Sequence, residues 1–158
     1  MSYRIRDICN TEYDILKDFL YEAIFIKEGI SPPSKDIIME PELRVYIDDF
    51  GKKVGDIAFV AEDDKKIIGA VWVRIMNDYG HIDDETPSLA ISLYKNYRNC
   101  GIGTALMKKI LDALKENGYK QASLAVQKAN YAVKLYKKVG FEIVDENEDE
   151  YIMKCILW

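Results

Sequence analysis

The stretch from residue 88 to residue 104 joins an apolar segment, a short polar turn and the start of an amphipathic segment, and the turn contains Arg98, Gly101 and Gly103. A turn of this kind between a strand and a helix can present several backbone N–H groups to an anion. The first N–H groups of a helix have no intrahelical acceptor, and the helix dipole is positive there. Glycine also lets the backbone approach a phosphate without a Cβ in the way. The stretch therefore predicts a cradle for a phosphate or a pyrophosphate.

Two common phosphate-binding patterns do not fit this turn. The dinucleotide pattern G-x-G-x-x-G matches Gly101 and Gly103 but requires a third glycine where the chain has Leu106. The nucleotide pattern G-x-x-x-x-G-K-[ST] occurs nowhere in the sequence. A dinucleotide-dependent enzyme is therefore disfavoured, although the turn still indicates an anion site.

A third pattern fits both the turn and the segment that follows it. The hexapeptide RNCGIG at residues 98–103 resembles the R/Q-x-x-G-x-G/A signature of the GNAT family, the GCN5-related N-acetyltransferases. Residues 123–141 are similar to the second half of the family pattern: a strand, then Asn130, then a helix with a Leu-Tyr pair that ends in Gly-Phe. The resemblance extends over residues 88–144, about a third of the chain.

The resemblance implies that the loop holds the pyrophosphate of acetyl-coenzyme A (acetyl-CoA). The residues that it assigns to this co-substrate are Ile91, Leu93, Arg98, Asn99, Cys100, Gly101, Ile102, Gly103, Thr104, Asn130 and Tyr136. In the family, the strand before the loop splays from its parallel neighbour, so the backbone N–H of Leu93 is expected to bind the thioester oxygen. Lys95 stands where the family often has a proline. Asn130 is expected to cap the next helix and to reach the pantetheine arm or the catalytic tyrosine.

Tyr136 matches the position of the family's general acid. Amine acetylation from a thioester requires a polarised carbonyl, a neutral amine and a proton for the departing thiolate. A phenol with a pKa of ~10 can protonate a thiolate with a pKa of ~8.5 only in a desolvated and well-positioned arrangement. The alternative is that Tyr136, one of 11 tyrosines, only packs in the core on an apolar helix face.

For the general base and for the residues that bind the acceptor, the sequence offers candidates and leaves alternatives open. The polar loop 81–85 precedes the strand at a place where the family often keeps a carboxylate, so Glu85 is the candidate base. Asp83, Glu22 and Glu28 are candidates for binding a cationic acceptor. Loss of the proton through ordered water, and a merely solvated acidic surface, remain alternatives.

The composition limits the class of protein. The net charge is −5, which argues against a nucleic-acid partner and favours a small cationic amine. No apolar run reaches the length of a membrane span and no signal segment opens the chain, so we expect no membrane partner. Cys9, Cys100 and Cys155 have no metal-ligand spacing and leave one thiol over in any pairing. We therefore expect no metal, free thiols and a cytoplasmic location.

The sequence predicts one domain over residues 1–158, with a mixed α/β (α+β) sheet of the GNAT type. The predicted strands are 3–8, 57–61, 67–76, 89–93, 122–126, 141–144 and 150–157, and the predicted helices are about 10–29, 41–51, 102–115 and 130–140. The order β-α-α-β-β-β-α-β-α-β-β makes strands four and five parallel, because a helix crosses over between them.

These observations predict an N-acetyltransferase that moves acetyl from acetyl-CoA directly to an amine in a ternary complex. The alternative is a catalytically silent acyl-CoA-binding sensor or regulatory module. Small amines and peptide amines both remain open as acceptors, and the chain is expected to be a monomer or a homodimer.

Overall fold

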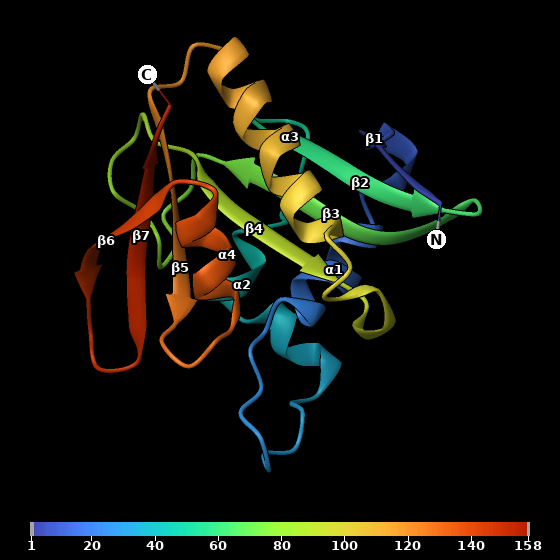
Figure 1. Ribbon diagram of the computed structural model, residues 1–158, viewed down its shortest axis with the longest axis horizontal. Coiled ribbons are helices and arrows are strands. Elements are labelled where there is room, and N and C mark those ends of the chain that lie inside the picture. The colour runs from blue at the N-terminus through green and yellow to red at the C-terminus, as the bar shows by residue number, and fades with distance from the viewer. Residues whose placement is uncertain (1, 158) are drawn as a thin grey trace.

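The computed structural model describes residues 2–157, which form a seven-stranded sheet with helices on both faces (Figure 1). The strands are β1 (Tyr3–Asp7), β2 (Ile57–Asp63), β3 (Lys66–Arg74), β4 (Ser88–Leu93), β5 (Gln121–Gln127), β6 (Phe141–Glu146) and β7 (Glu150–Ile156). The helices are α1 (Ile15–Glu22), α2 (Pro41–Arg44), α3 (Ile102–Glu116) and α4 (Ala132–Lys138), with short 3-10 turns at Asn10–Glu12, Lys35–Met39 and Lys95–Tyr97. The strand order is β1-β2-β3-β4-β5-β7-β6, and β4 and β5 are parallel, as the sequence predicts.

The two faces of the sheet have separate cores. Side chains alternate along a strand, so Phe59 and Val71 pack under α3, whereas Val60 and Trp72 pack on the α1 side. Helices α3 and α4 lie in front of the sheet in Figure 1, and α1 and α2 lie behind it. A site that combines groups from both faces therefore requires an opening between two strands of the sheet.

The sheet opens in this way where β4 and β5 separate. The two strands are paired at Ser88 and Ser123 alone, and they diverge toward their carboxyl ends (Figure 1). Ser123 is held at this point, because its Oγ donates to the carbonyl of Gly80 at 2.8 Å. A Cβ on Gly80 would lie 2.9 Å from the carbonyl carbon of Leu124, so glycine lets the 77–87 loop cross closely over β5. The predicted splay is therefore confirmed, and the loop and the serine pair mark its origin.

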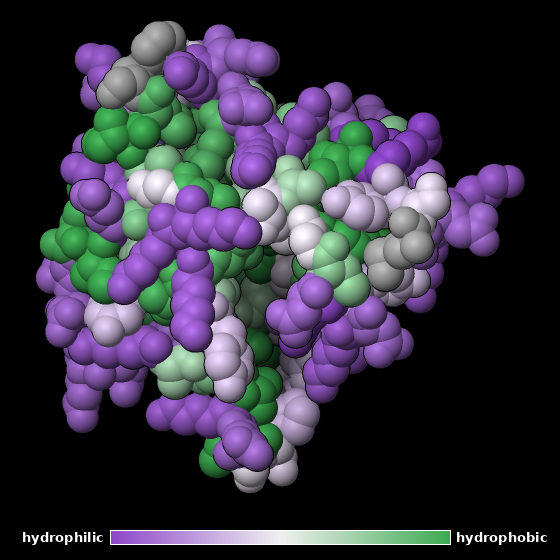
Figure 2. All heavy atoms as spheres, in the orientation of Figure 1, coloured by the Kyte–Doolittle hydropathy of each residue, from purple (hydrophilic) through white to green (hydrophobic). Residues whose placement is uncertain are grey.

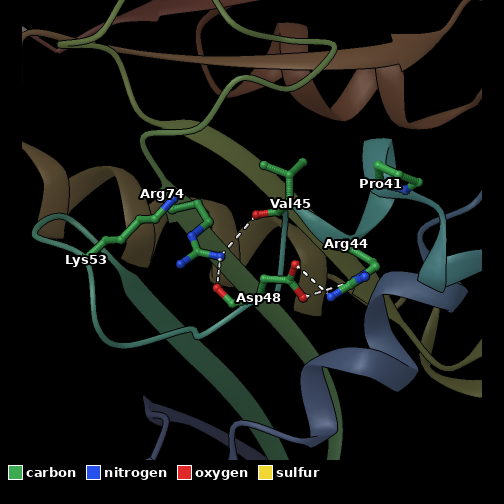
Figure 3. A pocket seen from close by; sticks show the side chains of 6 residues that line it. All are labelled: Pro41, Arg44, Val45, Asp48, Lys53 and Arg74. Atoms are coloured by element: carbon green, nitrogen blue, oxygen red, sulfur yellow. Dashed lines mark hydrogen bonds and ion pairs between the residues drawn. The ribbon is translucent and has the colours of Figure 1, made fainter.

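Helices α1 and α2 are shorter than predicted. Helix α1 ends at Glu22 instead of near Gly29, since the following residues turn inward to line a cavity. Helix α2 ends at Arg44 instead of near Gly51, because side chains of β3 take the carbonyl groups beyond it. Arg74 donates to the carbonyls of Val45 and Asp48 at 3.1 and 2.8 Å (Figure 3), and the indole of Trp72 donates to the carbonyl of Tyr46 at 3.0 Å. Residues 45–50 therefore continue as turns.

Arg74 also forms a fully buried ion pair with Asp56. Its Nη2 lies 2.9 Å from Asp56 Oδ2 and its Nε lies 3.1 Å from Oδ1, and both side chains are 0% exposed. The pocket of about 270 Å³ beside this pair is lined by the exposed cations Arg44 and Lys53 (Figure 3). Because the Arg74 guanidinium is fully used by carbonyls and by a carboxylate, we interpret this region as structural. It fixes the segment that carries Tyr46 against β3.

The two arginines of this pocket provide a matched test. Arg74→Met leaves the Asp56 carboxylate buried without a cation, so the free energy of unfolding should fall by about 3–5 kcal/mol. Arg44 pairs with Asp48 on the surface, so Arg44→Met should cost less than about 1 kcal/mol. Urea unfolding measures both values, and equal losses would contradict a structural role for the buried pair.

Candidate active site

The loop between β4 and α3 presents a run of unused backbone donors. Among the described residues, no acceptor takes the N–H groups of residues 99–104, and the first bond of α3 runs from Ala105 N to Gly101 O at 3.2 Å. Asn99 and Gly101 have positive φ angles of 61° and 85°, which Asn and Gly adopt most readily. These two residues turn the chain at the N-terminus of α3. The unused backbone N–H groups therefore lie at the positive end of the helix dipole. The cradle loop, residues 98–104, therefore fits an anion such as a pyrophosphate.

The cradle loop lies against helix α4. A Cβ on Gly103 would lie 3.4 Å from Leu135 and 3.8 Å from Leu93, at ordinary contact distance. Ile102 is buried, Cys100 is exposed, and Thr104 is partly exposed in the first turn of α3. Figure 2 shows the face that carries α3 and α4, with a hollow beside α4 and hydrophobic residues in its depth.

The edge of β4 adds two further donors. Leu93 is opposite Gly69 of β3, but Tyr94 N donates to Ile68 O at 3.0 Å, so Leu93 and Gly69 form a non-hydrogen-bonded pair. By the same alternation, the N–H groups of Ile91 and Leu93 both point away from β3, into the gap left by β5. Gly69 makes room for this arrangement, since a Cβ there would overlap the Leu93 side chain.

A central cavity of about 230 Å³ occupies this gap. Its lining includes Ala90 and Ile91 on one edge and Ala125 on the other. Asn130 and Tyr136 line it from the α4 side, whereas the segments around Phe25, Tyr46 and Tyr79 line it from the opposite side. The cavity therefore connects the two faces of the sheet at the point where the strands have separated.

Tyr136 and Asn130 lie where the sequence predicts. Tyr136 is 8% exposed, its ring packs against Phe141, and burial raises the pKa of its hydroxyl to about 12. The hydroxyl therefore keeps its proton throughout the neutral range. Asn130 Oδ1 accepts a hydrogen bond from Ala132 N at 2.9 Å, so its side chain binds the first N–H of α4, although Tyr131 is the residue directly before the helix.

Arg98 makes contacts that the sequence does not predict. Its Nε donates to the carbonyl of Leu93 at 3.0 Å, and its Nη2 lies 3.4 Å from Glu22 Oε2. The guanidinium therefore gives a hydrogen bond to the free carbonyl at the end of β4 and forms an ion pair with the last residue of α1. Glu22 already has a cation, and Glu28 lies in an exposed turn beyond the helix. Neither glutamate lines the central cavity, so their positions do not support the predicted contact with an acceptor.

In the acidic loop before β4, the predicted site residue Asp83 makes its side-chain hydrogen bonds within the loop itself. Asp83 accepts hydrogen bonds from Thr86 Oγ1 at 2.7 Å and from Glu85 N at 2.9 Å, and the Thr86 hydroxyl is the main cause of its lowered pKa. Glu85 is exposed, and neither Asp83 nor Glu85 lines the central cavity. The loop adjoins the start of β4, at the opposite end of the strand from Leu93. The structure therefore gives no support to Glu85 as a base or to Asp83 as an acceptor contact.

The sequence analysis missed the carboxylate that does line the cavity. Glu150 is the first residue of β7 and is paired with Gln127, the last residue of β5. Burial is the main cause of the raised pKa of its carboxyl group. In the sequence, Glu150 directly follows the acidic stretch 145–149, and the pattern indicates only that it begins the last strand of a hairpin. No local signal separates it from its neighbours, because the pairing of β7 with β5 alone brings it to the cavity.

Residues 2–157 contain no group of three His, Cys, Asp or Glu side chains that could hold a metal ion. Within the same range, no helix has both the length and the apolar character needed to cross a membrane.

Comparisons with known proteins identify the family. The model of the acetyltransferase (GNAT) family matches residues 21–141. An N-alpha-acetyltransferase of Sulfurisphaera tokodaii is 33% identical over 115 residues, which cover 63% of this chain and 68% of that relative. The [ribosomal protein bS18]-alanine N-acetyltransferase of Haemophilus influenzae is 37% identical over 68 residues, or 43% of this chain and 47% of that relative. The PaiA N-acetyltransferase of Thermoplasma acidophilum, solved with coenzyme A, has a TM-score of 0.72 at 20% identity, with 99% of both chains covered.

The chain belongs to the GNAT acetyltransferase family. This membership confirms the predicted family and fold, and it supports N-acetyltransferase activity of the GNAT type. It also implies binding of acetyl-CoA, which the free donors of the cradle loop fit.

The cradle loop can be tested with an isosteric pair at Gly103. Both Gly103→Asp and Gly103→Asn place a side chain of the same size beside Leu135, but only Asp adds a negative charge at the anion site. We expect calorimetry to show coenzyme A binding at least about tenfold weaker for Asp than for Asn. An aspartate near a helix N-terminus stabilises the helix, so the Asp variant should remain folded. Equal affinities of the two variants would exclude a phosphate at this loop.

Proposed function

We propose that this protein transfers an acetyl group from acetyl-CoA to a primary amine by direct attack within a ternary complex. The observation that carries the proposal is the central cavity, which joins the two faces of the sheet. A donor held at the cradle loop on the α3 side and an amine from the α1 side can meet in this gap. No covalent enzyme intermediate is needed, because both substrates reach the same space.

Each group along the gap has a proposed task. Acetyl-CoA, when bound, supplies a thioester as the source of the acetyl group. The N–H groups of residues 99–104 bind its pyrophosphate, and the Leu93 N–H donates to the carbonyl oxygen, where negative charge develops. Tyr136 holds its proton at Oη and donates it to the departing sulfur. The apolar walls exclude water, which strengthens each of these interactions.

The proposed acceptor is a primary amine that is cationic in solution and releases one proton to water before its neutral nitrogen attacks the acetyl carbonyl. The net charge of −5 favours such a molecule, and the names of both relatives described above denote N-acetyltransferases. The cytoplasmic location and the oligomeric state remain predictions from the sequence.

A panel of primary amines, assayed with acetyl-CoA for release of free thiol, tests the proposal. Release of thiol that depends on the amine supports transfer. Binding of coenzyme A without release for any amine would favour the alternative, a silent acyl-CoA-binding module.

The role of Tyr136 can be tested against a second tyrosine beside the same helix. Tyr136→Phe keeps the ring and its packing on Phe141 but removes the proton, so kcat should fall by about 10²-fold or more. Tyr131 directly precedes α4 and is 86% exposed, so Tyr131→Phe should leave kcat unchanged. Neither change should alter the affinity for coenzyme A. Full turnover of Tyr136→Phe, under conditions where chemistry limits the rate, would reduce Tyr136 to a packing residue.

A further inference from the structure

We propose that Glu150 binds the ammonium group of the acceptor before this group releases one proton to water and its neutral nitrogen attacks the thioester, and that the site selects one ammonium group attached to an apolar body. This inference rests on the proposed function and deepens it. It concerns a residue for which neither the sequence pattern nor the comparisons provide a role.

Within residues 2–157, Glu150 is the one charged side chain in the lining of the central cavity. The rest of the lining consists of apolar residues, tyrosines, one glutamine and one asparagine. The carboxylates predicted from the sequence, at positions 22, 28, 83 and 85, all lie outside this lining. A cation that enters the cavity therefore meets a single opposite charge, on β7 at the carboxyl end of β5.

The Glu150 carboxylate has no cationic partner within residues 2–157. The nearby Lys128 instead pairs with Glu146, with Nζ 3.1 Å from Oε1. Burial raises the pKa of Glu150, a hydrogen bond with Asn147 lowers it, and the neighbouring Asp149 raises it. A partly desolvated carboxylate of this kind gains more from an external ammonium than a solvated surface carboxylate does.

Two tyrosines complete the cation site. Tyr46 and Tyr79 both line the cavity, and the charge of Glu150 contributes to the raised pKa of each phenol. Tyr46 is fixed, because its hydroxyl donates to Asp78 Oδ2 at 2.8 Å while Asp78 Oδ1 accepts from Ser88. Tyr79 is 52% exposed and lies at the mouth of the cavity. Aromatic rings near a carboxylate are favourable surroundings for an ammonium group.

The remaining wall determines the body of the acceptor. Ile24, Phe25, Ile37 and Leu43 line the side of the cavity that faces away from α4. An apolar group next to the ammonium can bury its surface there, whereas a second charge would lack a partner. Arylalkyl amines and peptides with an apolar first residue share this chemistry, and the assay below compares the two sources.

A pair of acceptors with the same shape isolates the charge. Phenethylamine is an ammonium ion at neutral pH, whereas O-benzylhydroxylamine has a nearly identical shape and a neutral amine. Glu150→Gln should lower kcat/KM for phenethylamine by at least about tenfold, the effect of one charge-assisted contact. It should leave kcat/KM for O-benzylhydroxylamine within about twofold of the wild type. A peptide that begins with phenylalanine should show the same loss as phenethylamine if peptides are the natural source.

Asp149→Asn is the matched control, because it removes the same charge from an exposed residue next to Glu150. It should change neither acceptor's kcat/KM, and coenzyme A should bind all three proteins equally. If Glu150→Gln changes both acceptors alike, or changes neither, Glu150 does not bind the ammonium group, although the proposed function stands. If the wild type acetylates no amine while it binds coenzyme A, the proposed function itself fails.

Discussion

The separation of β4 from β5 is the constraint on which the rest of this structure depends. In a continuous parallel sheet, the N–H groups of Ile91 and Leu93 would bond to the neighbouring strand. Here the strands pair only at Ser88 and Ser123, so these donors point into the gap, where Ile91 lines the central cavity. Unused backbone groups are tolerated at this edge because it opens into a cavity instead of a packed core, and because Arg98 satisfies the Leu93 carbonyl. The same gap holds the central cavity, which connects the two faces of the sheet.

The C-terminal half of the fold was predictable because its signals are local. The glycines of the cradle loop, the apolar periodicity of α3 and the cap at Asn130 act within a few residues of their own positions. The prediction of a helix over residues 102–115 differs from the observed α3 by one residue. The parallel pairing of β4 and β5 then follows from the crossover helix. The cradle loop and the position of Tyr136 belong to this predictable part.

The N-terminal half and the acceptor side depend on distant contacts. Helix α2 stops at Arg44 because Arg74, 29 residues after Val45 in the chain, takes carbonyl groups that a longer helix would use. Glu150 enters the cavity only through the register of β7 on β5, whereas Asp83 is turned back onto its own loop. Charge and composition alone could not distinguish these carboxylates, because the difference lies in tertiary pairing.

The contact of Arg98 with Glu22 has a thermodynamic consequence. Arg98 is the first residue of the cradle loop. Glu22 is the last residue of α1 and directly precedes residues that line the cavity on the side away from α4. If a ligand of the cradle loop shifts Arg98, it therefore changes the free energy of the segment after α1, which lines the cavity. By linkage, each ligand must then alter the affinity for the other by the same factor. Under the proposed function, affinities measured for either ligand alone would then not describe the ternary complex.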